Sequence, residues 1–225
     1  GVSGQDVYMN FKSASEARYK RLVVPIEVMP VQGDLLQTNG TTNIHPKWNP
    51  KENSYIYLSN KNNDYFGQTD LYYHDLDSNE EKKIKSSVLS APTWHSNGRM
   101  IYYSKKSKYP NKYGSRYYDI YSFDLDTEEE ERLTIDARAF SPVFIEDDSS
   151  IAYLATYDGG QDIYKLDLRS NISKKLTDFK DRPMISHLNY NAGTQQIYFD
   201  ITKHHHRDIY SYDLSNNTIH KIESS

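Results

Sequence analysis

Cysteine is absent from the 225-residue sequence, which excludes disulfides, thiolate metal sites and cysteine nucleophiles. Long hydrophobic runs are also lacking. The longest apolar stretch, residues 22–29, is interrupted by Pro25 and Glu27 and is far shorter than the roughly 18 residues of a membrane helix, so we expect no direct membrane insertion. The net charge is −4 and no basic stripe occurs, which argues against a nucleic-acid partner.

Helical periodicity is also scarce, since only residues 13–21 are compatible with a brief helical turn. The sequence is instead rich in tyrosine: it has 21 Tyr, 7 Phe and 2 Trp, although hydrophobic residues make up only 36%. Rings with a polar tip suit half-buried strands, where one end packs and the other meets water. The composition therefore favours an all-β protein with thin layers.

A seven-residue segment recurs four times along the chain. It reads DLYYHDL at 70–76, DIYSFDL at 119–125, DIYKLDL at 162–168 and DIYSYDL at 208–214. Before each copy come a bulky apolar residue, a polar turn and a tyrosine-centred strand; after it comes a charged outer strand. The bulky residues are Trp48, Trp94, Phe144 and Leu188.

Each unit thus supplies four strands in about 45 residues, which is typical of a β-propeller blade. We predict four complete four-stranded antiparallel blades, at approximately 43–88, 89–137, 138–181 and 182–225. The segment GQDVYMNF at 4–11 echoes GQDIYKLDL at 160–168, so residues 1–42 are predicted to hold the third and outer strands of a partial blade, followed by an insertion.

The Asp-Ile/Leu-Tyr…Asp-Leu strands and the Pro-x-Trp/Phe segments together resemble the TolB-like, WD-repeat-like propeller family over about residues 43–223. The second unit departs least from the family pattern, with Pro92, Trp94, Ser96, Asn97 and Gly98, and the fourth unit departs most. The resemblance implies a periplasmic scaffold that holds another protein at one end of the propeller. It also implies six or more blades, so we expect this chain to be a portion of a larger propeller, or its partial blade to be completed by another chain.

Strand order places the second-to-third and outer-to-first loops at the same end of the blades. The longest second-to-third loops are 60–69, 105–118, 156–161 and 202–207. Loops on a rigid scaffold often carry recognition, so we predict that a protein partner docks there, with a merely solvated loop as the alternative for 105–118. The candidate partner-binding residues are Tyr65, Lys105, Lys106, Tyr109, Lys112, Tyr113, Arg138, Arg182, His204, His205 and His206.

No constellation of residues indicates catalysis, a metal or another cofactor. His204 and His206 would face the same way in an extended segment, but no third ligand is identifiable. His45, His95 and His187 lie at different offsets from the bulky residue of their blades, which argues against a shared cluster. Because an active site occurs once and the Asp pairs recur, we expect the first Asp of each pair to accept hydrogen bonds from loop backbone and the second to start a turn.

The sequence therefore predicts a non-catalytic binding or assembly scaffold of TolB-like type in the bacterial envelope, periplasmic or secreted, although no signal peptide is visible. Additional blades or domains of the same larger protein are expected partners. One alternative is an accessory propeller of a larger enzyme such as a peptidase. A second is a lyase acting on acidic sugars, which would need clustered His and Arg at the mouth of the channel.

Overall fold

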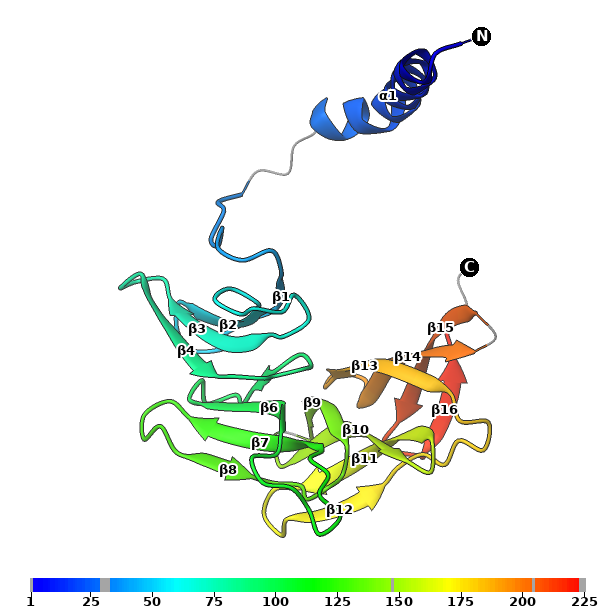
Figure 1. The fold of residues 1–225 in the computed structure, drawn as a ribbon. Helices are drawn as coiled ribbons and strands as arrows, with labels where there is room; N and C mark the ends of the chain where they lie inside the picture. The colour runs from blue at the N-terminus through cyan, green and yellow to red at the C-terminus, as the bar shows by residue number, and fades with distance from the viewer. Residues whose placement is uncertain (1, 29–32, 147, 204, 223–225) are drawn as a thin grey trace. The chain divides into compact units, whose positions relative to one another are not determined.

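The computed structural model describes residues 2–28, 33–146, 148–203 and 205–222. The chain divides into two units, Gly1–Thr38 and Asn39–Ser225. The second unit contains four antiparallel sheets of four strands, which follow one another around a common centre (Figure 1). The predicted all-β propeller of four-stranded blades is confirmed.

Residues 4–28 form an α-helix, α1 (Gly4–Val28), so the partial blade predicted within residues 1–42 is wrong. The helix begins at a capping box. The Ser3 hydroxyl accepts a hydrogen bond from the Asp6 backbone N–H at 3.1 Å, and the Asp6 carboxylate accepts one from the Ser3 backbone N–H at 3.2 Å. The helix-forming residues 12–18 continue it, with Lys12 and Glu16 paired at 3.9 Å one turn apart. These local preferences outweigh the resemblance of residues 4–11 to a strand.

The strands of each blade pair in chain order, so that each sheet is a simple meander. Blade 1 comprises β1 (Asn43–Trp48), β2 (Ser54–Ser59), β3 (Asp70–Asp75) and β4 (Glu80–Lys85). Blade 2 comprises β5 (Thr93–Trp94), β6 (Met100–Lys106), β7 (Tyr118–Asp124) and β8 (Glu130–Arg132). Blade 3 comprises β9 (Ala139–Ile145), β10 (Ser150–Tyr157), β11 (Gly160–Asp167) and β12 (Ile172–Lys175). Blade 4 comprises β13 (Met184–Asn191), β14 (Gln196–Lys203), β15 (His206–Asp213) and β16 (Thr218–Lys221).

In blades 1 to 3 the first Asp of each pair has the role expected from the sequence, and the second Asp has its expected role in all four blades. Buried Asp119 accepts hydrogen bonds from the backbone N–H groups of Asp136 at 3.1 Å and Ala137 at 2.9 Å, in the connection to the next blade. The same contact recurs between Asp70 and the Ser87 N–H and between Asp162 and the Phe179 N–H, both at 3.0 Å. The second Asp accepts the N–H two residues later, in the pairs Asp75–Asp77, Asp124–Asp126, Asp167–Arg169 and Asp213–Ser215.

Consecutive blades pack face to face through the bulky residue of the first strand. Trp94 is only 8% exposed, and its indole N–H donates to the Lys47 carbonyl of the preceding blade at 2.9 Å. Phe144 meets Tyr102 of the preceding blade edge to face, with ring centroids 4.8 Å apart. Trp48 occupies the same position in blade 1 and is 57% exposed, because no sheet precedes blade 1 among the described residues.

The strand register corrects the assignment of the bulky residue in blade 4. In the other blades this residue pairs with the first core residue of the second strand: Trp48 with Tyr55, Trp94 with Ile101 and Phe144 with Ile151. In blade 4 the equivalent core residue, Ile197, pairs with Tyr190. Leu188 lies two residues earlier, where the other three blades have proline. Tyr190 is difficult to recognise as the bulky residue from the sequence, because an asparagine lies on each side of it.

Candidate functional site

The loops predicted to carry recognition do gather at one end of the blades. The β3 end of the 60–69 loop contacts the blade 1–blade 2 connection, where the Val88 N–H donates to the Thr69 carbonyl at 3.0 Å. The β6–β7 loop contacts the blade 2–blade 3 connection through Arg138, whose Nη2 donates to the Tyr117 hydroxyl at 3.0 Å. Second-to-third loops and outer-to-first connections therefore share this end, which we call the loop end.

Two of the four loops expected to be long are short turns. Strands β10 and β11 continue to a two-residue turn at Asp158–Gly159, with φ angles of 51° and 76°. Both values lie in the left-handed region, which is typical of tight hairpins and which Asp and Gly adopt more readily than most residues. Strands β14 and β15 likewise pair as far as Lys203 and His206. The loop end is therefore dominated by residues 60–69 and 107–117.

The β6–β7 loop presents two tyrosine–lysine pairs to solvent. Tyr109 and Tyr113 are 70% and 77% exposed. The Lys112 ammonium lies 4.9 Å from the Tyr113 ring centroid, and Lys108 lies 5.3 Å from that of Tyr109. Asn111 organises the loop, because its side-chain oxygen accepts the N–H groups of residues 113 and 115. The loop is thus a structured surface with basic and aromatic character.

Lys105 has a different environment from the loop residues predicted with it. Strand β6 runs to Lys106, and alternation along the strand turns the Lys105 side chain onto the blade face. Its ammonium lies 2.6 Å from Glu130 and 4.6 Å from the Tyr121 ring centroid. Burial opposes ionisation of Glu130, but hydrogen bonds from Lys105 and Tyr103 hold its pKa below the usual value. Lys105 therefore stabilises the blade, whereas Lys106 is exposed.

The other predicted partner-binding residues are dispersed around the loop end. Tyr65 is exposed in the β2–β3 loop. Arg138 stacks on Tyr117, with its guanidinium carbon 4.4 Å from the ring centroid. Exposed Arg182 packs closely against Gly160 at the start of β11. A side chain at this position would not fit easily, because a Cβ added to Gly160 would lie 3.2 Å from the Arg182 Cγ. His206 is the first residue of β15 and His205 directly precedes it; both are exposed, and His204 lies outside the described residues.

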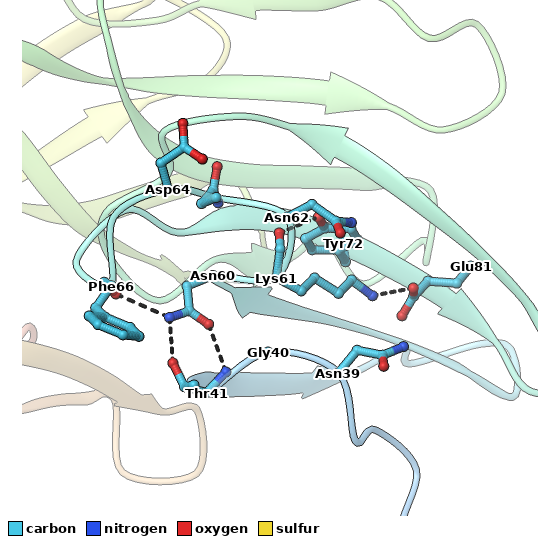
Figure 2. Close-up of a pocket in the computed structure, with 11 residues that line it drawn as sticks. Asn39, Gly40, Thr41, Asn60, Lys61, Asn62, Asp64, Phe66, Tyr72 and Glu81 are labelled. Atoms are coloured by element: carbon cyan, nitrogen blue, oxygen red, sulfur yellow. Dashed lines mark hydrogen bonds and ion pairs between the residues drawn. The ribbon is translucent and has the colours of Figure 1, made fainter.

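A cavity of about 630 Å³ lies on blade 1 between the segment 39–41 and the β2–β3 loop (Figure 2). Asn60 joins its two walls. The Asn60 side-chain oxygen accepts the backbone N–H of Thr41 at 3.1 Å, and its amide nitrogen donates to the Thr41 hydroxyl at 2.8 Å and to the Phe66 carbonyl at 3.3 Å. The sequence did not single out this cavity, because its polar lining reads as ordinary loop composition.

The floor of this cavity is an ion pair between buried Lys61 and partly exposed Glu81, on an aromatic surface. Lys61 contacts Glu81, donates to the Tyr57 hydroxyl at 2.9 Å and lies 4.1 Å from the Tyr72 ring centroid. Burial opposes ionisation of Glu81, but the hydrogen bonds from Lys61 and Tyr57 hold its pKa below the usual value. This group repeats the arrangement of Lys105, Glu130, Tyr103 and Tyr121 in blade 2.

In blade 2 the corresponding group is partly covered by blade 1. The Lys85 ammonium of blade 1 reaches across the junction to within 3.9 Å of Glu130 and lies 4.6 Å from the Phe123 ring centroid. The blade 1 cavity therefore lies on a face that the repeat covers with a neighbouring sheet. We interpret it as part of a packing face rather than as a small-molecule site.

His45 and His187 occupy equivalent positions, contrary to the sequence-based expectation. With Tyr190 in the place of Leu188, each histidine lies three residues before the bulky residue of its blade. Their ring centroids are 5.7 Å apart, so the first strands of blades 1 and 4 approach one another here. His45 and His187 therefore have equal offsets, and the expectation of unequal offsets is wrong for these two residues. His95 is elsewhere, packed edge to face on Phe144 at 5.2 Å.

Comparison with solved structures identifies the fold. TolB from Acinetobacter baumannii superposes with a TM-score of 0.61 at 20% identity, covering 80% of this chain and 43% of that one. A structure assigned as TolB from Agrobacterium tumefaciens superposes with a TM-score of 0.69 at 18% identity, covering 85% and 65%. The chain has the TolB-like propeller fold. No family model and no curated protein matches the sequence.

An enzyme is also among the similar structures. A puromycin-hydrolyzing peptidase from Mycobacterium tuberculosis superposes with a TM-score of 0.64 at 12% identity, covering 84% of this chain and 29% of that one. The chain therefore spans less than two thirds of each of these three structures. At such identities the likeness concerns the fold, and function must be argued from the residues of this chain.

The described part of this TolB-like propeller contains no group of three or more His, Asp or Glu side chains placed to hold a metal ion. His187 has an acidic neighbour, with its Nδ1 3.6 Å from an Asp200 oxygen, but Asp200 is also bonded to Arg207 at 2.9 Å. Within the part of the chain that the structure describes, no helix is long and apolar enough to cross a membrane.

The histidine pair of this TolB-like propeller predicts a pH-dependent stability. Burial, then His187 and Lys47, lower the pKa of His45 below 6.5. The unfolded chain therefore takes up this proton more readily than the folded protein. The stability contributed by neutral His45 is present above pH 6.5 and is lost as the pH falls below that value.

We expect His45→Gln to reduce the fall in thermal midpoint between about pH 7.5 and about pH 5.5. The measurement is thermal unfolding followed by circular dichroism at both pH values. His220→Gln is the matched control, because His220 is exposed on β16. An equal fall in the wild type and in His45→Gln would contradict the prediction.

Proposed function

We propose that the chain is a non-catalytic binding or assembly module, whose loop end holds a protein partner with an acidic surface, in the periplasm or outside the cell. The observation that carries the proposal is the β6–β7 loop. Its exposed Tyr109 and Tyr113 are paired with lysines on a framework fixed by Asn111. Tyrosine and arginine are enriched at protein interfaces, and charge complementarity speeds association.

The charge distribution supports an acidic partner. Residues 105–118 contain five Lys and Arg and no acidic residue, whereas the whole chain carries a net charge of −4. Lys105 is engaged with Glu130, so the docking cations are Lys106, Lys108, Lys112 and Arg116, together with Arg138 at the neighbouring connection. A basic patch on an acidic protein indicates a local docking role rather than a general attraction to anions.

An accessory role in a larger enzyme is the second candidate, and the similarity to the Mycobacterium tuberculosis peptidase favours it. In that case the loop end would contact a catalytic domain instead of a separate protein. Both candidates use these blades as a binding module, and both place the contact on the same loops. The location outside the cytoplasm is supported by the resemblance to the TolB-like family seen in the sequence.

The test is affinity capture from a native cell extract with two charge-reversal variants. Lys108→Glu with Lys112→Glu changes the loop end, and Lys51→Glu with Arg169→Glu makes the same change in charge at exposed turns between other strands. We expect proteins captured by the wild type to be retained by the control and lost by the loop variant. Capture that is unchanged by the loop variant would contradict docking at these residues.

A further inference from the structure

A second cavity, which we call the junction cavity, opens at the loop end where blade 1 meets blade 2, and its volume is about 360 Å³. It lies between the 60–69 loop, the connection to blade 2 and the loop-side ends of β6 and β7. Among the residues that line it are two tyrosines, a leucine and a lysine: Tyr65, Tyr118, Leu89 and Lys106. The volume is at the lower end of the roughly 300–1,000 Å³ of ligand pockets, which suits one large side chain and its immediate neighbour.

Hydrogen bonds fix the floor of the junction cavity. The Val88 N–H donates to the Thr69 carbonyl at 3.0 Å, and the Thr69 hydroxyl donates to the Val88 carbonyl at 2.6 Å. The Leu89 N–H donates to the Ser104 carbonyl of β6 at 3.2 Å. The connection is thus tied to both blades. Because the floor is held in place before anything binds, an occupant does not have to order it.

The repeat explains why the junction cavity is open. Counted from the backbone N–H that the first Asp of the repeat accepts, Leu89 and Arg138 hold the same position, two residues later. At the second junction Arg138 lies over Tyr117, with its guanidinium carbon 4.4 Å from the ring centroid. At the first junction the shorter Leu89 stands in its place and is 51% exposed. The chain therefore covers this position with an arginine at one junction and leaves an apolar side chain open to solvent at the other.

The lining of the junction cavity is basic as well as apolar. Lys106 and Tyr118 are paired directly across β6 and β7, so their side chains share one face of the hairpin. None of the described residues that line the cavity is acidic. Among the described residues Lys106 forms no ion pair, whereas Lys105 contacts Glu130. An occupant that carries a carboxylate beside a large apolar group would complement this surface.

We propose that the junction cavity anchors an extended acidic segment of the partner. One aromatic side chain of that segment occupies the space between Tyr65, Leu89 and Tyr118, and a neighbouring carboxylate pairs with Lys106. An aromatic guest suits this lining because aromatic rings pack on one another edge to face or offset. This inference rests on the proposed function, since it names the feature of the acidic partner that the loop end recognises. The lysines of the β6–β7 loop attract the segment, and the cavity selects the aromatic residue.

The experiment is fluorescence anisotropy with two labelled peptides, Glu-Asp-Glu-Phe-Glu-Asp-Glu and the same peptide with Ala in place of Phe. The full 225-residue chain is titrated to about 500 µM, which covers micromolar dissociation constants. We expect the wild type to bind the Phe peptide at least about tenfold more tightly than the Ala peptide. Lys106→Gln should weaken the binding of both peptides. Lys51→Gln, at an exposed turn between other strands, is the control and should bind as the wild type does.

Leu89→Arg gives the sharpest result. It places in the junction cavity the residue type that the repeat has at Arg138, so the variant should fold, which circular dichroism verifies. The added positive charge favours any acidic peptide, but the filled cavity should reduce the preference for Phe to less than about threefold. A wild type without a preference for Phe, or a Leu89→Arg variant that keeps the full preference, would overturn the proposal.

Failure of the anchor and failure of the proposed function give different results. If both peptides bind the wild type equally, and Lys108→Glu with Lys112→Glu releases both, the loop end docks an acidic partner without this anchor. If neither peptide binds the wild type, docking of an acidic partner at the loop end is contradicted together with the anchor.

Discussion

Replacing Asp119 with alanine is expected to lower the free energy of unfolding by about 3–5 kcal/mol, the range seen when one partner of a buried ion pair is removed. The Asp119 side chain is fully buried, and it accepts hydrogen bonds from Arg132 at 2.6 Å and from the Thr134 hydroxyl at 2.8 Å. It also accepts the two backbone N–H groups at the start of the connection to blade 3. Alanine would leave the buried Thr134 hydroxyl and the buried Ala137 N–H without their acceptor, and it would leave Arg132, which is 29% exposed, without one of its two carboxylate partners.

Asp208→Ala is the matched control, because Asp208 occupies the same repeat position in blade 4. Its side chain is 40% exposed and pairs with half-exposed Lys221 at 2.8 Å, so its removal should cost less than about 1 kcal/mol. Urea denaturation of the wild type and of both variants measures the difference. A similar loss for the two variants would mean that the repeat position, rather than burial and bonding, sets the contribution of this aspartate.

The repeat made much of the propeller predictable from the sequence. Because the pattern recurs four times, the length of the repeat can be measured directly from the sequence. The Asp pairs could be assigned a structural role because they recur in every blade. Blade boundaries followed from the same repeat. The N-terminal segment could not be read in this way, because its resemblance to residues 160–168 competed with a capping box between Ser3 and Asp6. A strand also needs a neighbouring strand to pair with, and a helix forms its own hydrogen bonds.

The errors at the candidate site have local physical causes. Lys105 was grouped with the loop because lysine in a tyrosine-rich segment suggests exposure, whereas strand β6 extends to Lys106 and turns Lys105 onto Tyr121. The contact between His45 and His187 depends on the strand register of blade 4. The sequence does not reveal this register, because Leu188 is also a large buried residue and lies two positions before Tyr190. Both errors arose where a one- or two-residue shift changes the face that a side chain occupies.

Trp94→Ala is expected to cost about 3–5 kcal/mol of stability, as is usual when a buried tryptophan is truncated. Trp94 is 8% exposed, and it contributes both packing against Tyr73 of blade 1 and the hydrogen bond to the Lys47 carbonyl. Its loss would open a void within the first blade junction and leave a carbonyl without its donor. Urea denaturation at a protein concentration where sedimentation shows a monomer is the appropriate measurement.

Trp48→Ala makes the same chemical change at the same repeat position, but without a covering blade. Since Trp48 is 57% exposed, we expect it to cost less than about 1 kcal/mol in the monomer, within the range of ordinary surface substitutions. The difference between the two variants measures what a neighbouring blade contributes to a tryptophan at this position. Equal losses under monomeric conditions would mean that another part of the same chain covers Trp48, which would contradict this prediction.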